Sequence, residues 1–264
     1  MKNSRSHNSV RLALFDIDGT IFRSSLIIEL FNELARRGIY PAESSREVER
    51  NYVAWLNRKG HYNDYLMKLV HIFYRNIRGC SVRAIEAAVR AVIGRQKDRV
   101  HRFPRQLIRD LRRKGYFIIA ISNSPEPMVK RFADVMKFDA AIGHQLQVAD
   151  GVYTGRSVYD GKLRAGMARM DKVGILRRYI EEHGLRVDFA SSVMIGDSEG
   201  DKPLLSLVGH PIAFNPSLPL ARIARRKGWR IVVERKDVVY DIRDAAFIHI
   251  DGSEPRVPYG HSGK

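Results

Sequence analysis

Short apolar runs alternate with helix-spaced stretches over most of the chain, and this alternation limits the fold more than any other feature. Strand-like runs cover residues 10–15, 116–121, 192–195, 211–214 and 230–233. Helical spacing covers residues 104–114, 126–136, 172–183 and 218–227. Strands that alternate with helices favour a mostly parallel sheet, whose ligands gather at the carboxyl ends of the strands. The sequence therefore predicts an α/β fold with a Rossmann-like, doubly wound core.

One region interrupts this alternation. Residues 25–99 carry helical apolar spacing throughout and contain no convincing strand. We expect three or four helices here, inserted after the first strand as a cap over the site. Later, apolar and polar residues alternate over 142–159, around Asp150-Gly151, which predicts a hairpin. The expected divisions are flexible tails at 1–9 and 252–264, a helical cap domain at 25–99, and a core domain at 10–24 and 100–251.

Length and composition are those of a soluble globular protein. The 264 residues suffice for one catalytic domain with a sizeable insertion, and 44% are hydrophobic while 28% are charged. No apolar run approaches the ~18 residues of a membrane-spanning helix, and the run at 10–15 is too short for a secretory signal. We therefore expect a cytoplasmic location. The single cysteine, Cys80, cannot form an intrachain disulfide, and no cysteine cluster indicates zinc.

The chain is strongly basic, with 46 Lys and Arg against 29 Asp and Glu and a formal net charge of +17. Such an excess is compatible with nucleic-acid binding, with an anionic membrane surface, with attraction of phosphorylated substrates, or with solubility alone. The basic residues are spread through the chain in pairs beside helical apolar spacing, which favours solvated helix faces. No nucleic-acid motif is present, so we expect no nucleic-acid partner, while association with an anionic membrane surface stays open.

Two carboxylates follow the first strand-like run, in Asp16-Ile17-Asp18-Gly19-Thr20. An aspartate can attack phosphorus and form an acyl phosphate that is then hydrolysed. The neighbouring Asp18 would protonate the leaving alcohol and later activate water. Gly19 permits the sharp turn that brings both side chains to one site. The alternative is a pair of capping residues at a helix start.

Two further segments, each next to a strand-like run, carry candidate residues. Ser122, followed by Asn123, ends the second strand-like run before a helix, where a hydroxyl and backbone N–H groups favour phosphate, although a plain N-cap fits as well. Asp197 and Asp201 follow the run at 192–195 and offer the oxygen ligands that Mg²⁺ prefers, although Gly196-Asp197-Ser198 also suits a turn.

A lysine between these segments is the fourth candidate. Lys172 would neutralise both the aspartate nucleophile and the phosphate. Taken alone it reads as a surface lysine, and Lys162 competes with it for the role.

The order of these elements, strand-DxDGT, strand-Ser, Lys and strand-GDxxxD, resembles the haloacid dehalogenase superfamily over roughly residues 12–233. By this resemblance Asp16 is the nucleophile and Asp18 the general acid and base. Ser122 and Lys172 bind phosphate, and we assign the adjacent Gly19, Thr20 and Asn123 to the same task. The resemblance implies Mg²⁺ as cofactor. Its implied ligands are Asp16, Asp197 and the backbone carbonyl of Asp18, with Asp201 supporting the metal site.

The helical insertion resembles the branch of this superfamily that contains phosphoserine phosphatase. Those enzymes carry an acidic residue nine positions after the nucleophile, where this chain has Ser25, and usually read Ser-Gly-Gly where it has Ser-Asn-Ser-Pro. The expected function is hydrolysis of a phosphomonoester, of a small metabolite or a phospholipid head group. Phosphoserine hydrolysis, phosphoryl transfer to an alcohol, and non-catalytic binding of a polyanion or ligand are the alternatives. The cap residues considered for the substrate pocket are Tyr52, Arg58, Tyr62, Tyr65 and Arg75. The sequence does not indicate an oligomeric state.

Overall fold

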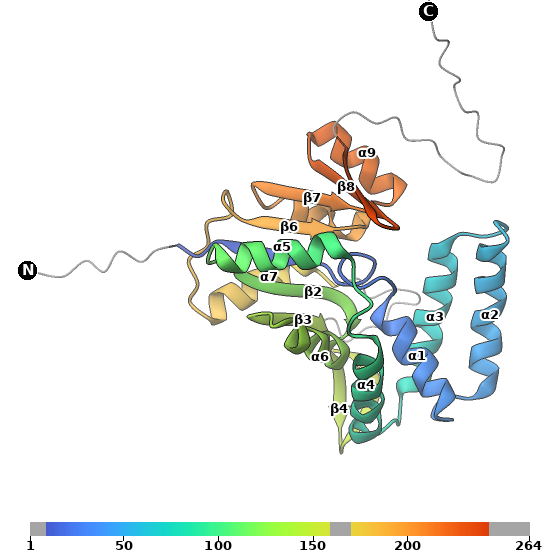
Figure 1. The fold of residues 1–264 in the computed structure, drawn as a ribbon. Coiled ribbons are helices and arrows are strands. Elements are labelled where there is room, and N and C mark those ends of the chain that lie inside the picture. The colour runs from blue at the N-terminus through green and yellow to red at the C-terminus, as the bar shows by residue number, and fades with distance from the viewer. Residues whose placement is uncertain (1–8, 159–169, 243–264) are drawn as a thin grey trace, which may run out of the picture.

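The computed structural model describes residues 9–158 and 170–242 (Figure 1). Most of the two expected tails, the lysine candidate Lys162 and residues 243–251 of the expected core lie outside the described residues. No helix of the part described is long and apolar enough to cross a membrane.

A seven-stranded sheet forms the core, in the order β3-β2-β1-β6-β7-β8-β9. Neighbouring strands are parallel except for the last pair, β8 and β9. The strands are β1 (Leu12–Phe15), β2 (Phe117–Pro125), β3 (Ala140–His144), β6 (Val193–Gly196), β7 (His210–Phe214), β8 (Arg230–Arg235) and β9 (Val238–Ile242). The mostly parallel α/β fold expected from the alternation of strands and helices is confirmed.

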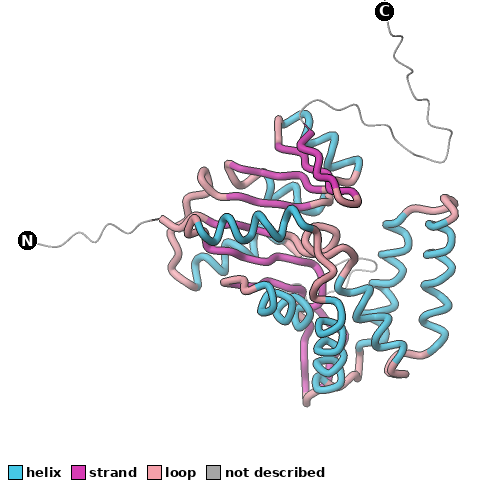
Figure 2. Tube along the Cα trace, in the orientation of Figure 1, coloured by secondary structure: helices cyan, strands magenta, loops and turns pink. Residues whose placement is uncertain are grey.

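Helices cover both faces of this sheet (Figure 2). Because successive side chains of a strand point to opposite faces, Ala13 and Phe15 pack into one apolar cluster while Leu12 and Leu14 pack into another. The first cluster is completed by α5 (Arg102–Arg113) and α6 (Glu126–Met136), and the second by α7 (Lys172–Glu182), α8 (Lys202–Leu205) and α9 (Leu218–Lys227).

Four helices occupy the region inserted after β1: α1 (Leu26–Arg36), α2 (Ala42–Leu56), α3 (Tyr62–Ile77) and α4 (Val82–Gln96). Figure 1 shows α2 and α3 side by side, projecting away from the sheet, while α4 lies next to α6. The hairpin of β4 (Leu146–Ala149) and β5 (Val152–Ser157) joins this helical layer. Its Tyr153 N–H donates to Cys80 O at 3.0 Å and Gly79 N–H donates to Tyr153 O at 2.8 Å. A segment that lies between β3 and β6 in the sequence therefore supports the inserted helices.

The structure corrects the sequence expectations in three places. The hairpin was expected to begin at residue 142, but Ile142 lies in β3 and pairs with Ile121 of the main sheet. The strand β2 continues to Pro125, so Ser122 and Asn123 lie within its last residues rather than after it. The sequence pattern also missed β9, an exposed strand that pairs antiparallel with β8.

A buried carboxylate ties α1 to α4. The side chain of Glu33 is 1% exposed and accepts from Arg36 and Arg37 of its own segment at 2.8 and 2.6 Å, and from Arg95 of α4 at 2.6 Å. The hydrogen bond from Arg36, followed by those from Arg37 and Arg95, lowers the pKa of Glu33 to about 2 even though burial works against this shift. Glu33 is therefore charged in the folded protein at any ordinary pH.

We expect Glu33→Gln to lower the free energy of unfolding at neutral pH by about 2 kcal/mol, because three arginines lose a charged acceptor. The folded pKa lies below the ordinary value of 4.5, so this stabilisation is present above 4.5 and is lost as the pH falls toward 2. Urea unfolding of the wild-type protein and of Glu33→Gln from pH 7 to pH 3 measures the difference in unfolding free energy, which should narrow as the pH falls. The control is Glu43→Gln, which removes an ion pair whose side chains are both 68% exposed, and which should cost under ~0.5 kcal/mol. Equal losses for the two variants would contradict the role of Glu33.

Candidate active site

The carboxyl ends of three adjacent strands bring the candidate residues together. Because β1 lies between β2 and β6, Asp16 after β1, the last residues of β2 and Asp197 after β6 meet at one edge of the sheet. The Asp16 N–H donates to Ile195 O at 3.0 Å, which extends the sheet to the first site residue. Parallel strands thus place side chains from distant parts of the sequence at a single point.

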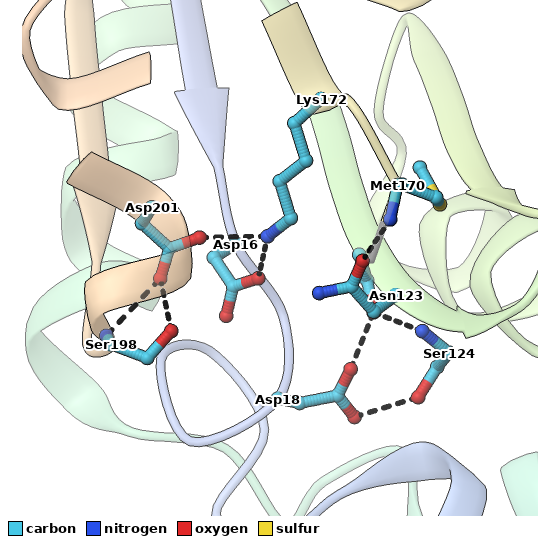
Figure 3. Close-up of polar contacts among 9 residues, drawn as sticks. Asp16, Asp18, Asn123, Ser124, Met170, Lys172, Ser198 and Asp201 are labelled. Carbon is cyan, nitrogen blue, oxygen red and sulfur yellow. Dashed lines mark hydrogen bonds and ion pairs between the residues drawn. The ribbon is translucent and has the colours of Figure 1, made fainter. Parts of the chain in front are cut away.

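Lys172 joins two of these carboxylates. It is the first residue of α7 and is 5% exposed, and its ammonium donates to Asp16 Oδ1 at 2.8 Å and to Asp201 Oδ1 at 2.7 Å (Figure 3). Burial alone would lower the pKa of Lys172, but the charges of Asp16 and Asp201 outweigh burial, so that the net change is upward. The ammonium therefore stays protonated. The reading of this residue as a surface lysine is wrong.

Asp201 is held at both oxygens. While Oδ1 accepts from Lys172, Oδ2 accepts from the N–H of Ser198 at 3.1 Å and from its hydroxyl at 3.0 Å. Asp201 is fully buried and belongs to the short helical turn Glu199–Asp201. Its carboxylate thus fixes both the lysine and the loop that carries Asp197.

Asp18 lies on the other side of Asp16 and points toward α1. Its Oδ1 accepts from the backbone N–H of Leu26, the first residue of α1, at 2.5 Å and from Ser124 Oγ at 3.1 Å. Its Oδ2 accepts from Ser122 Oγ. One carboxylate therefore links the loop after β1, the end of β2 and the start of the helical insertion. Ser124 was not among the residues singled out from the sequence, although it belongs to the same Ser-Asn-Ser-Pro segment as Ser122.

The electrostatics of the site favour a bound cation. One oxygen each from Asp16, Asp197 and Asp201 lies within 4.8 Å of the others. Burial, followed by the charge of Asp201, raises the pKa of Asp16 to about 8, and burial with the charge of Asp16 raises the pKa of Asp197 well above its ordinary value. Lys172 offers one positive charge to three carboxylates. The single charge of Lys172 does not balance these carboxylates, and their oxygens are the hard donors that a divalent cation such as Mg²⁺ prefers.

The other predicted residues differ in their surroundings. Gly19 has φ +79°, and a Cβ on it would lie 2.3 Å from Asp197 Oδ2. Asn123 is exposed and its Oδ1 accepts from the Met170 N–H at 3.3 Å. Thr20 is fully buried and its hydroxyl has no hydrogen-bond partner among the described residues. Direct contact of Thr20 with a phosphate stays a prediction.

A cavity of about 1160 Å³ opens above these residues, between the sheet edge and the helical insertion. Of the predicted site residues, those that line it are Asp16, Asp18, Gly19, Asn123, Lys172 and Asp197. Thr20, Ser122 and Asp201 lie outside the lining that the structure describes. Of the cap residues considered for a pocket, Tyr62 and Arg75 line the cavity, whereas Tyr52, Arg58 and Tyr65 are not among its described walls.

Comparison with known proteins places this arrangement in a family. A sequence profile described as haloacid dehalogenase-like hydrolase matches residues 13–206. The chain belongs to the haloacid dehalogenase-like hydrolase family. This confirms the family expected from the order of the motifs, and the curated relatives described next confirm the likeness to its phosphoserine phosphatase branch.

Among curated relatives of this hydrolase, a phosphoserine phosphatase of Streptomyces coelicolor is 29% identical over 81% of the chain and 46% of its own length. A histidinol-phosphatase of Neisseria meningitidis is 29% identical over 48% of the chain and 56% of its own length. The matched part therefore spans about half the length of these relatives.

Solved structures share the fold. A Bordetella pertussis protein with unknown function has a TM-score of 0.67 at 24% identity, over 85% of this chain and 98% of its own. A phosphoserine phosphatase solved as a phospho-aspartyl intermediate analogue has a TM-score of 0.55 at 21% identity, over 87% and 96%. At these identities the likeness establishes the architecture of the hydrolase.

Gly19 allows a test of the geometry around Asp197. Gly38 has a similar positive φ of +68° but nothing within 4 Å of an added Cβ. We expect Gly38→Ala to cost about 1 kcal/mol of unfolding free energy from backbone strain alone. Gly19→Ala should cost at least about 1 kcal/mol more, because the new methyl group must displace the Asp197 carboxylate. Denaturant unfolding of both variants measures the difference, and equal costs would show that the loop after β1 does not lie against Asp197.

Proposed function

We propose that this protein is a Mg²⁺-dependent phosphatase that hydrolyses a phosphomonoester through an aspartyl-phosphate intermediate on Asp16. The observation that carries the proposal is the Asp16 carboxylate at the floor of the cavity. One of its oxygens is held by the buried ammonium of Lys172, and the other accepts no hydrogen bond from the residues that the structure describes. The names of the curated relatives, a phosphoserine phosphatase and a histidinol-phosphatase, support the same reaction class.

The proposed reaction uses the two aspartates in turn. The free oxygen of Asp16 attacks phosphorus, a new P–O bond forms, and the ester P–O bond breaks while Asp18 gives its proton to the leaving oxygen. Asp18, now a carboxylate, then takes a proton from the water that attacks the phosphorus of the acyl phosphate. The bond to Asp16 breaks, and inorganic phosphate and the original carboxylate are released. Lys172 holds Asp16 in place and balances negative charge near the phosphoryl group.

Mg²⁺ would supply positive charge that offsets the repulsion between the carboxylates and a dianionic phosphate. The residues proposed to hold it are Asp16, Asp197 and the backbone carbonyl of Asp18. Asp201 is proposed to position the site rather than to ligate directly, because Lys172 and Ser198 already engage both of its oxygens.

Phosphoserine itself is not the substrate that we propose. Ser25 lies in the cavity wall where the resemblance places an acidic residue, and it is 5% exposed at the start of α1. A serine offers no charge to the ammonium of phosphoserine. We assign the substrate to other phosphomonoesters of metabolites or lipids.

Asp16→Asn should abolish phosphate release, with a loss of at least ~10³-fold, because the amide has nearly the same shape but is a poor nucleophile. The fold should persist, since the substitution removes a buried charge that is repelled by Asp201. Phosphate release with Mg²⁺ and with EDTA, and thermal unfolding by circular dichroism, measure both effects. The matched control is Asp171→Asn on the neighbouring exposed N-cap of α7, which should retain activity. Activity of Asp16→Asn near that of the wild type would defeat the proposed mechanism.

Metal binding can be measured without turnover. Mg²⁺ at a hundredfold excess over its Kd should stabilise the wild-type protein by about 2.7 kcal/mol, because it binds only the folded state. Asp197→Asn should lose most of this stabilisation, whereas Asp171→Asn should keep it. Thermal unfolding in a Mg²⁺ titration gives the answer. An unchanged Mg²⁺ response in Asp197→Asn would remove this residue from the proposed ligand set.

A further inference from the structure

The cavity is larger than the phosphate site requires. Its volume of about 1160 Å³ exceeds the ~300–1,000 Å³ of most pockets that enclose a small molecule. The aspartates and Lys172 occupy only its floor, so most of the space lies above them, against α3 of the helical insertion. The group attached to the phosphate has this space available.

The wall above the floor is apolar. Leu66, Met67 and Val70 of α3 line the cavity and are partly exposed, and Ile27 of α1 joins them. The adjoining side of α3 supplies the packing of the insertion through buried residues, which are Tyr65, Leu69, Ile72 and Phe73, and Leu66 and Val70 also pack against this cluster. The parts of the Leu66, Met67 and Val70 side chains that the packing leaves exposed in the cavity meet water at a cost in free energy, unless a ligand covers them.

The charged groups of the cavity are unequally placed. Its acidic lining residues, among those described, are Asp16, Asp18, Asp197 and Glu199, all from the sheet side. The described lining residues that the insertion contributes include no aspartate or glutamate. An ammonium group on the leaving group would therefore face apolar side chains, Arg75 and histidines rather than a carboxylate. This wall suits an uncharged apolar group.

Apolar side chains continue from the wall to the outer surface. Tyr62 lines the cavity and is 41% exposed, and its ring lies 5.2 Å from that of Trp55. Tyr52, 5.8 Å from Trp55, is 40% exposed, and Leu56 is 52% exposed. An apolar chain longer than the cavity would thus pass from the wall of α3 onto this aromatic rim.

We propose that the substrate is an amphiphilic phosphomonoester, whose phosphate binds at Asp16 and whose uncharged apolar chain lies along Leu66, Met67 and Val70 of α3. This assignment deepens the proposed phosphatase function and rests on it. Under this assignment, the residues at the floor of the cavity determine the reaction, and the residues of its wall determine which substrate binds. Catalysis and substrate binding can be measured separately.

Binding of methyl-, butyl- and octylphosphonate to the wild-type protein with Mg²⁺ tests the wall without turnover. Each methylene that contacts the wall should lower the Kd by up to about 4-fold, because its apolar surface leaves water. Octylphosphonate should therefore bind at least roughly 100-fold more tightly than methylphosphonate by calorimetry. A Kd that does not change with chain length overturns the inference, whether or not the protein hydrolyses phosphomonoesters.

The variant Val70→Thr tests whether the dependence of the Kd on chain length arises at α3, because it replaces one methyl group by a hydroxyl at nearly constant shape. The Kd of octylphosphonate should rise by about 3- to 10-fold, while that of methylphosphonate should not change. The control is Val53→Thr, a 43% exposed valine of α2 outside the described cavity lining, which should alter neither Kd. Equal effects of the two variants on octylphosphonate would overturn the assignment.

Turnover then distinguishes the inference from the function on which it rests. Hydrolysis of octyl phosphate that requires Asp16, with kcat/KM rising along the alkyl series, supports both. Asp16-dependent hydrolysis with a flat series overturns the inference alone. Chain-length-dependent binding without hydrolysis of any alkyl phosphate supports the amphiphile site and overturns the phosphatase function. Comparison with a long-chain lipid phosphate in phosphatidylcholine vesicles separates a substrate in solution from one in a bilayer.

Discussion

The ion pair of Lys172 with Asp16 and Asp201 is the interaction on which the site depends. It joins α7, the loop after β1 and the turn after β6, three segments that meet only because β1 and β6 are neighbours in the sheet. Without the ammonium, the carboxylates of Asp16, Asp197 and Asp201 would lie close together with no positive charge from Lys172 to offset their repulsion. Lys172 therefore offsets part of the negative charge of these carboxylates, and a bound cation would offset the remainder.

Asp18 connects the site to the helical insertion. Its carboxylate accepts from the first N–H of α1, and it also holds Ser122 and Ser124 of β2. A group proposed to exchange protons with the substrate thus also fixes the start of the layer that covers the cavity. A shift of α1 relative to the sheet would therefore change the hydrogen bonds that hold the Asp18 carboxylate. The capping role weighed for this motif and its chemical role are compatible.

The sequence predicted what depends on local patterns. Every parallel strand except β3 was marked by its own apolar run, and the polar residues at three strand ends mark the site because parallel strands end at one edge. What the sequence missed depends on contacts between distant segments. The burial of Lys172 follows from partners 156 and 29 residues away. Ser124 gains significance only when Asp18 lies beside it. The strand β9, whose Val238, Val239 and Tyr240 are exposed rather than buried, is defined by its pairing with β8.

Charge differs between the outer surface of the protein, the floor of the cavity and the wall of the cavity. The four arginine pairs of the sequence, at 36–37, 112–113, 177–178 and 225–226, are all exposed on helices or at a helix end, so their positive charge lies on the surface. A positive surface attracts anions from a distance but does not choose among them. The floor of the cavity has the opposite sign and, under the proposed function, would accept a phosphate only together with a cation. The apolar residues of α3 carry no charge, so under the proposed substrate assignment they would distinguish substrates by the surface area of the leaving group, a criterion that is insensitive to salt.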